Sequence, residues 1–110
     1  MVADLFPSLP VLHDRNVDQH YQSLSAFIKS MRGSDPDATR YWPAKLIHAG
    51  EDTRFIARRI MIHTSEDVGV ADNTALQTAV PALHAVQHIG YPEAQIVLAH
   101  AALHICRAPK

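Results

Sequence analysis

Apolar side chains recur at intervals of three and four residues through most of this chain, and short polar segments separate the periodic stretches. The first clear stripe consists of Tyr21, Leu24, Phe27, Ile28 and Met31. Such spacing places the side chains on one face of a helix, whereas a half-buried strand needs apolar and polar residues in alternation. No alternating segment of that kind competes with the helical pattern. The sequence therefore predicts an all-α fold.

Residues that favour helix starts and ends occur at the boundaries of these periodic stretches. Carboxylate side chains accept hydrogen bonds from the first N–H groups of a helix, and glycine readily adopts the left-handed conformation that follows the last turn. The expected helix starts are Asp35 with Pro36, Asp52, Asp72 or Asn73, and Pro92 with Glu93. The expected ends are Gly33, Gly50 and Gly90. Because the connections are short, we expect about five helices in a compact bundle of helical hairpins.

Prolines interrupt this pattern at two kinds of place. Pro7 and Pro10 lie near the start, where we expect an extended lead-in over residues 1–18. Pro43 and Pro81 lie inside the second and fourth helical patterns. A proline inside a helix removes one backbone hydrogen bond and clashes with the preceding turn. We therefore expect both helices to bend, and the second one to kink at Pro43 or break beside it.

The last helical pattern, over residues 93–107, is apolar on nearly every side. A helix of that kind is buried, so we expect it to be central to the bundle or shared with another subunit. Residues 64–72, by contrast, are mostly polar and contain Gly69. They indicate a turn between the third and fourth helices.

Composition limits the classes of function that are open. Apolar residues make up 47% of the chain, charged residues 19%, and the formal net charge is -1. These values are typical of one globular domain and provide no strong field that would attract nucleic acid or a membrane. The single cysteine, Cys106, fits a reducing compartment. With no long apolar run and no signal-like start, we expect a cytoplasmic protein with no membrane partner.

No segment carries a recognisable catalytic or cofactor-binding pattern. A phosphate-binding loop needs glycine directly before Lys-Ser or Lys-Thr, and no such sequence occurs. The pairs His84 with His88 and His100 with His104 have the spacing of neighbours on a helix, and four imidazoles could meet around Zn²⁺. Such pairs also arise by chance, and no glutamate follows the first histidine as in metalloproteases. We predict no catalytic residue, no cofactor and no metal in this chain.

Basic residues concentrate between positions 40 and 63. They are Arg40, Lys45, Arg54, Arg58 and Arg59. One interpretation is a DNA-binding patch, which needs unpaired bases. The other, which we favour, is a structural network of ion pairs and helix caps. Its expected members are Arg58, Arg59, Glu66, Asp67, Asp35 and Asp52, with Glu66 and Asp67 as acceptors for Arg59.

A series of short motifs at fixed spacings covers about residues 19–110. They include His20-Tyr21, Arg32-Gly33-Ser34-Asp35-Pro36-Asp37-Ala38, Tyr41-Trp42, Gly50-Glu51-Asp52, Ile56-Ala57-Arg58-Arg59, Ser65-Glu66-Asp67, Ala71-Asp72, Pro92-Glu93 and Ala108-Pro109-Lys110. This series resembles the C-terminal domain of the replication-associated recombination protein A family, also called the MgsA family, whose relatives include the Werner helicase-interacting protein. Pro43, Pro81 and the four paired histidines depart from the family's usual residues.

The resemblance implies that this chain is part of a longer AAA+ ATPase, whose ATP- and Mg²⁺-binding module lies outside it. It implies a fold similar to the C-terminal oligomerisation domains of clamp-loader subunits and assembly into a homotetramer. It also implies a nucleoid-associated parent enzyme that acts on DNA at stalled replication forks. Our candidates for the self-contact are Trp42, Leu83, Val86, Ile96, Val97, His100 and His104. The alternative is a module that binds DNA or replication-fork proteins.

Overall fold

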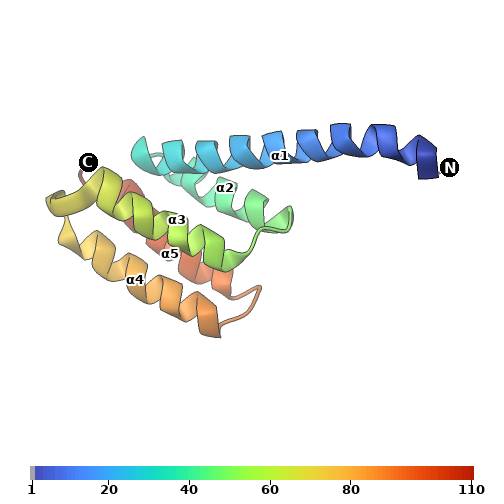
Figure 1. Ribbon diagram of the computed structural model, residues 1–110. Helices are drawn as coiled ribbons and strands as arrows, with labels where there is room; N and C mark the ends of the chain where they lie inside the picture. The colour runs from blue at the N-terminus through green and yellow to red at the C-terminus, as the bar shows by residue number, and fades with distance from the viewer. Residues whose placement is uncertain (1) are drawn as a thin grey trace.

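Figure 1 shows the computed structural model, which describes the backbone of residues 2–110 and the side chains of residues 17–110. Its five α-helices are α1 (Val2–Arg32), α2 (Pro36–His48), α3 (Thr53–His63), α4 (Asn73–His88) and α5 (Ala94–Arg107). A π-helical turn, η1 (Thr64–Val68), and a 3-10 turn, η2 (Gly69–Ala71), connect α3 to α4. No strand occurs in residues 2–110. The expected all-α bundle of about five helices is confirmed.

Helix α5 is the centre of the bundle, and it packs against all four other α-helices. In Figure 1 it runs behind α3, with α2 on one side and α4 on the other. Leu98 and Ile105 of α5 are fully buried. The other large core side chains are Phe27, Met31, Leu46, Ile56 and Ile60. Its contacts with four helices bury six of its 14 residues and explain why this segment carries so few polar residues, although Ile96 and His100 remain exposed.

Helix α1 is longer than expected, and its first turns extend beyond the other helices (Figure 1). The extended lead-in expected over residues 1–18 differs from the structure, because residues 2–18 are helical. Pro7 and Pro10 each remove one N–H donor, but adding a residue to an existing helix costs far less than starting a new one. The packed part of α1 provides such a start for the residues before it.

Helix α1 ends one residue later than its glycine suggests. The left-handed residue is Ser34, with φ 60°, and not Gly33. The N–H of Ser34 donates to the carbonyl of Met31 at 3.2 Å, and the N–H of Asp35 donates to the carbonyl of Ser30 at 3.0 Å. This pair of bonds is the Schellman ending of a helix. Gly33 is needed for a different reason, because a Cβ there would lie 3.0 Å from the carbonyl oxygen of Lys29.

The expected aspartate caps of α2, α3 and α4 are confirmed, whereas Glu93 before α5 makes no side-chain cap. Gly50 has φ 101° and follows α2 as the left-handed residue. Three aspartates accept a hydrogen bond at a helix start: Asp35 from the N–H of Ala38 (3.1 Å), Asp52 from that of Arg54 (2.8 Å) and Asp72 from that of Thr74 (3.0 Å). Gly90 closes α4 without a positive φ.

Neither internal proline breaks its helix. Helix α2 is continuous through Pro43, which is buried, and α4 is continuous through Pro81, which is exposed. Of the two alternatives expected at Pro43, a kink or a break beside it, the break is wrong. The buried proline ring packs into the bundle, and this burial offsets the hydrogen bond that it removes.

The buried face of α4 consists of Ala75, Ala79, Ala82 and Val86. Small residues on this face let α4 approach α3 and α5 closely. Leu76 and Val80, one residue along the helix from the first two alanines, remain 40% and 48% exposed. Val86 was an expected contact residue, but it is only 4% exposed and belongs to the core.

Candidate interaction surface on helices α4 and α5

A shallow groove of about 300 Å³ runs between α4 and α5. Its lining is almost entirely apolar or small: Thr78, Pro81, Ala82 and Ala85 from α4, and Val97, His100 and Ala101 from α5. Small side chains line the groove from both helices and leave the space between them open. Such a concave apolar surface can receive side chains of a partner.

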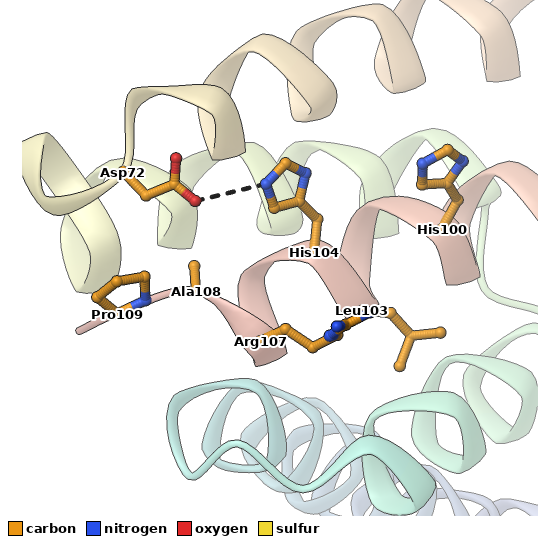
Figure 2. Close-up of a pocket in the computed structure, with 7 residues that line it drawn as sticks. All are labelled: Asp72, His100, Leu103, His104, Arg107, Ala108 and Pro109. Carbon is orange, nitrogen blue, oxygen red and sulfur yellow. Dashed lines mark ion pairs between the residues drawn. The ribbon is translucent and has the colours of Figure 1, made fainter.

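A larger pocket of about 630 Å³ lies at the C-terminal end of α5 (Figure 2). It is lined by Asp72, His100, Leu103, His104, Arg107, Ala108 and Pro109. Figure 2 shows that His100 and His104 project from α5 toward α4, whereas Leu103 and Arg107 project from a different side of the same helix. Because His100 also lines the groove, the pocket and the groove form neighbouring parts of one surface.

The imidazole of His104 fastens α5 to the start of α4. Its Nδ1 lies 2.7 Å from Oγ1 of Thr78, and its Nε2 lies 3.1 Å from Oγ1 of Thr74 and 3.5 Å from a carboxylate oxygen of Asp72. The hydrogen bond from the Thr74 hydroxyl holds the pKa of Asp72 below its usual value, and the charge of His104 adds to this effect. The carboxylate of Asp72 therefore stays ionised beside the imidazole.

This grouping of histidine, carboxylate and hydroxyl is not a nucleophilic site. The Thr78 hydroxyl donates its proton to the carbonyl of Thr74, one turn earlier in α4, at 3.1 Å. A nucleophilic hydroxyl must instead donate to the base that activates it. The arrangement explains why His104, although an expected contact residue, is mostly engaged inside the domain.

The other expected contact residues lie in different environments. Ile96 is 72% exposed, which suits a contact, and His100 is also exposed. Leu83, Val97 and Trp42 are half-buried against the core. Leu76 and Val80 are exposed aliphatic residues that the expected set omitted. Their spacing of four residues was visible in the sequence, but the pattern could not distinguish the two flanks of α4.

The charged network differs from the expected one. Glu66 and Asp67 do not accept hydrogen bonds from Arg59 among the described side chains. The Arg59 guanidinium instead lies 2.9 Å from Nε2 of His63, and Asp67 accepts a bond of 3.1 Å from Nε of Arg32. The hydrogen-bond partner of Asp67 is therefore Arg32 at the end of α1 and not Arg59 of α3.

His63 lies at the centre of this cluster and is only 3% exposed. Burial lowers its pKa, and the positive charge of Arg59 lowers the pKa further. The imidazole is therefore neutral at neutral pH. Nδ1 of His63, Oδ2 of Asp67 and Nε of Arg59 are all buried without a hydrogen-bond partner among residues 17–110. Buried polar atoms of this kind are uncommon and costly.

Most of the remaining bases have partners. Arg54 contacts the carboxylate of Asp52 at 2.8 Å, and this hydrogen bond lowers the pKa of Asp52 and raises that of Arg54. Arg40 contacts Asp37 at 2.9 Å. Lys45 lies over the ring of Trp42 at 5.1 Å from its centre. Arg58 is exposed, and no hydrogen bond or ion pair involves it within residues 17–110.

The four paired histidines do not form the cluster that a zinc site would need. His84 and His88 are exposed on α4, with ring centres 4.7 Å apart. Across residues 17–110, the only group of three candidate ligands with atoms within 4.8 Å of one another is His63, Glu66 and Asp67. That group lies at the junction of α3 and η1.

The class that these features define is an all-α bundle domain with an open, largely apolar groove along two of its helices. The profile of the family described as MgsA AAA+ ATPase C terminal matches residues 33–110. This match covers more than half of the chain, and the chain belongs to that family. The resemblance of the sequence to replication-associated recombination protein A is confirmed.

Relatives at high identity support the same assignment. An uncharacterised AAA domain-containing protein of Mycobacterium tuberculosis is 58% identical over 100 residues, which cover 91% of this chain and 22% of that protein. Replication-associated recombination protein A of Bacillus subtilis is 44% identical over 98 residues, or 89% of this chain and 23% of that protein. ATPase WRNIP1 of Dictyostelium discoideum is 36% identical over 109 residues, or 99% of this chain and 12% of that protein.

The chain thus spans less than a quarter of the length of these relatives. It is the C-terminal domain of an AAA+ ATPase of the replication-associated recombination family. Along residues 2–110, every helix is too short or too polar to cross a lipid bilayer.

Proposed function

We propose that this domain assembles its parent ATPase into a homotetramer, and that α4 and α5 provide the contact. The observation that carries the proposal is the exposure of three aliphatic side chains on these two helices. Ile96 is 72% exposed, Val80 48% and Leu76 40%. Aliphatic side chains gain free energy when a partner removes them from water.

The groove and the exposed side chains complement one another as two halves of a contact. A groove of about 300 Å³ can accept one or two aliphatic side chains, and the same helices present such side chains on other faces. Packing of the exposed side chains of one copy into the groove of another is a heterologous contact, which forms a closed ring when the rotation between subunits allows it. A stable contact buries more than about 1,000 Å² in total.

The activity of the whole protein is part of the proposal. The relatives are named as AAA proteins and ATPases, and we infer that ATP and Mg²⁺ bind in their other domains. The domain described here contributes assembly and no catalysis. DNA and replication-fork proteins are proposed partners of the full-length ATPase and not of this surface.

Pairing of the basic side chains weighs against the alternative of a DNA-binding domain. Arg40 and Arg54 each contact a carboxylate, and Lys45 lies over Trp42. Neutralised bases release few counterions from DNA, so they contribute little affinity. Of the five bases in the expected patch, Arg58 remains exposed without such a contact in the described region.

Light scattering across a hundredfold range of concentration tests the assembly proposal. We expect a tetramer, or a dimer in equilibrium with a tetramer. Ile96→Glu and Val80→Glu should shift the equilibrium toward monomer, because each buries a charge in the contact. Gln22→Glu is the matched control, because Gln22 is exposed on α1, outside the two helices of the proposed contact. A monomer at every concentration would refute assembly through this domain.

A further inference from the structure

Three side chains at the junction of α3 and η1 converge on one point. Nδ1 of His63 lies 3.7 Å from Oε2 of Glu66 and 3.7 Å from Oδ2 of Asp67. The three ligand atoms lie within 4.8 Å of one another. We propose that His63, Glu66 and Asp67 form a site for a divalent transition-metal ion, and that Zn²⁺ is the ion that these ligands suit best. This inference departs from our expectation that the chain binds no metal.

The two 3.7 Å distances from Nδ1 of His63 fit ligands of one metal ion better than they fit hydrogen bonds. A nitrogen and an oxygen that share a hydrogen lie at 2.7–3.2 Å in proteins, and 3.7 Å is beyond that range. Two ligands of one tetrahedral zinc ion, each about 2.1 Å from the metal, lie roughly 3.5 Å apart. Nδ1 of His63 and Oδ2 of Asp67 are separated by nearly this distance and have no other partner in the described structure.

Nδ1 of His63 and Oδ2 of Asp67 are buried, so their lack of a hydrogen-bond partner supports a metal site. His63 is 3% exposed, and the side chain of Asp67 is 10% exposed. An unpaired donor or acceptor in such a place costs free energy that a bound ion would recover. Glu66 is different, because its side chain is 58% exposed. It can close over the ion from the solvent side and leave a coordination position for water.

The surrounding contacts orient the ligands as the outer shell of a metal site does. Arg32 binds Oδ1 of Asp67 and leaves Oδ2 free to face His63. The hydroxyl of Thr64 donates to the carbonyl of Ile60 at 2.8 Å and fixes the turn between His63 and Glu66. Outer-shell bonds of this type hold a carboxylate or imidazole in one orientation. The π-helical geometry of η1 is also common at functional sites.

Arg59 competes with the ion for the same imidazole. Its guanidinium lies 2.9 Å from Nε2 of His63, and it must donate there, so that the ring hydrogen sits on Nδ1. Metal binding at Nδ1 moves the hydrogen to Nε2, and Arg59 then has to turn away. The carboxylates of Glu66 and Asp67 balance the two charges of the ion. Replacing Arg59 should therefore strengthen binding.

Calorimetric titration of the metal-free chain with Zn²⁺ is the test, and Co²⁺ provides a visible spectrum of the coordination. The exposed pair His84 and His88 could bind zinc by itself, so all variants carry His84→Gln and His88→Gln. We expect one equivalent of Zn²⁺ to bind this background. His63→Leu should abolish binding, Glu66→Gln should weaken it about tenfold or more, and Arg59→Gln should tighten it.

Glu66→Gln keeps the test decisive if His63→Leu fails to fold, because Glu66 is largely exposed and its replacement leaves the core intact. Melting curves with and without Zn²⁺ give a second readout, since an ion that binds only the folded chain raises the melting temperature. The proposal is overturned if the background variant binds no Zn²⁺ at about 100 µM, or if Glu66→Gln and Arg59→Gln both leave the affinity unchanged.

Discussion

Arg32, the last residue of α1, donates a hydrogen bond of 3.1 Å to Asp67, which lies 35 positions later in η1. The Arg32 side chain is 49% exposed, whereas that of Asp67 is 10% exposed. The bond therefore joins a surface cation to a nearly buried carboxylate. It ties the end of the first helix to the turn between α3 and α4.

Loss of Arg32 should destabilise the domain. Arg32→Met keeps much of the aliphatic chain but leaves the buried carboxylate of Asp67 with no cationic partner, so we expect a loss of roughly 1–3 kcal/mol in the free energy of unfolding. Arg40→Met is the matched control, because the pair Arg40–Asp37 is exposed on both sides and should cost less than about 1 kcal/mol. Urea denaturation measures both. Equal losses for the two variants would contradict this ranking.

Removing the Arg59 side chain should destabilise the domain less than removing one partner of a buried ion pair would. Its guanidinium contacts the imidazole of His63, and its Nε already lacks a partner. Arg59→Ala should therefore lower the free energy of unfolding by about 1 kcal/mol, the value of an ordinary hydrogen bond. The melting temperature of this variant in metal-free buffer is the measurement. A loss above about 3 kcal/mol would indicate that Arg59 pairs with a buried carboxylate after all.

Local and distant contacts differed in how well the sequence predicted them. The helix starts at Asp35, Asp52 and Asp72 were predictable because a cap involves residues two or three positions apart. The partner of Asp67 was not, because Arg59 on the adjoining helix and Arg32 on a distant one are both arginines. Only the packing of α1 against the rest of the bundle decides between them.

The sequence also did not predict which face of α4 is buried. Alanine counts as apolar in any pattern, so the stripe with Ala75 and Ala79 and the stripe with Leu76 and Val80 fit a buried face equally well. The structure buries the alanines, because small side chains allow the helices to approach closely. For the candidate contact surface this choice is decisive, since it leaves the larger aliphatic side chains outside.

Asp72 should make the free energy of unfolding of the domain depend on pH in the acidic range. Its folded pKa lies below the unfolded value, so its contribution is fully present above the unfolded pKa of about 3.9 and is lost as the pH falls through the folded pKa. Asp72→Asn retains a good helix cap but has no proton to bind. Its stability should therefore fall less steeply than that of the original chain as the pH falls below about 4. Parallel acid titrations followed by circular dichroism would refute this if their slopes coincide.

Gly33 and Ser34 exchange the roles that their residue types suggest, and two substitutions test this. Ser34 has φ 60°, a conformation that costs a side-chain-bearing residue free energy, so Ser34→Gly should stabilise the domain by up to about 1 kcal/mol. The gain is reduced by loss of the exposed bond from Lys110 to the Ser34 hydroxyl.

Gly33→Ala should act in the opposite direction. The added Cβ would lie 3.0 Å from the backbone oxygen of Lys29, which cannot move without disturbing the last turn of α1, and we expect a loss of roughly 1–3 kcal/mol. Thermal unfolding of both variants beside the original chain is sufficient. If Gly33→Ala is harmless and Ser34→Gly destabilises, the left-handed residue is Gly33, and the ending of α1 is the one that its sequence suggested.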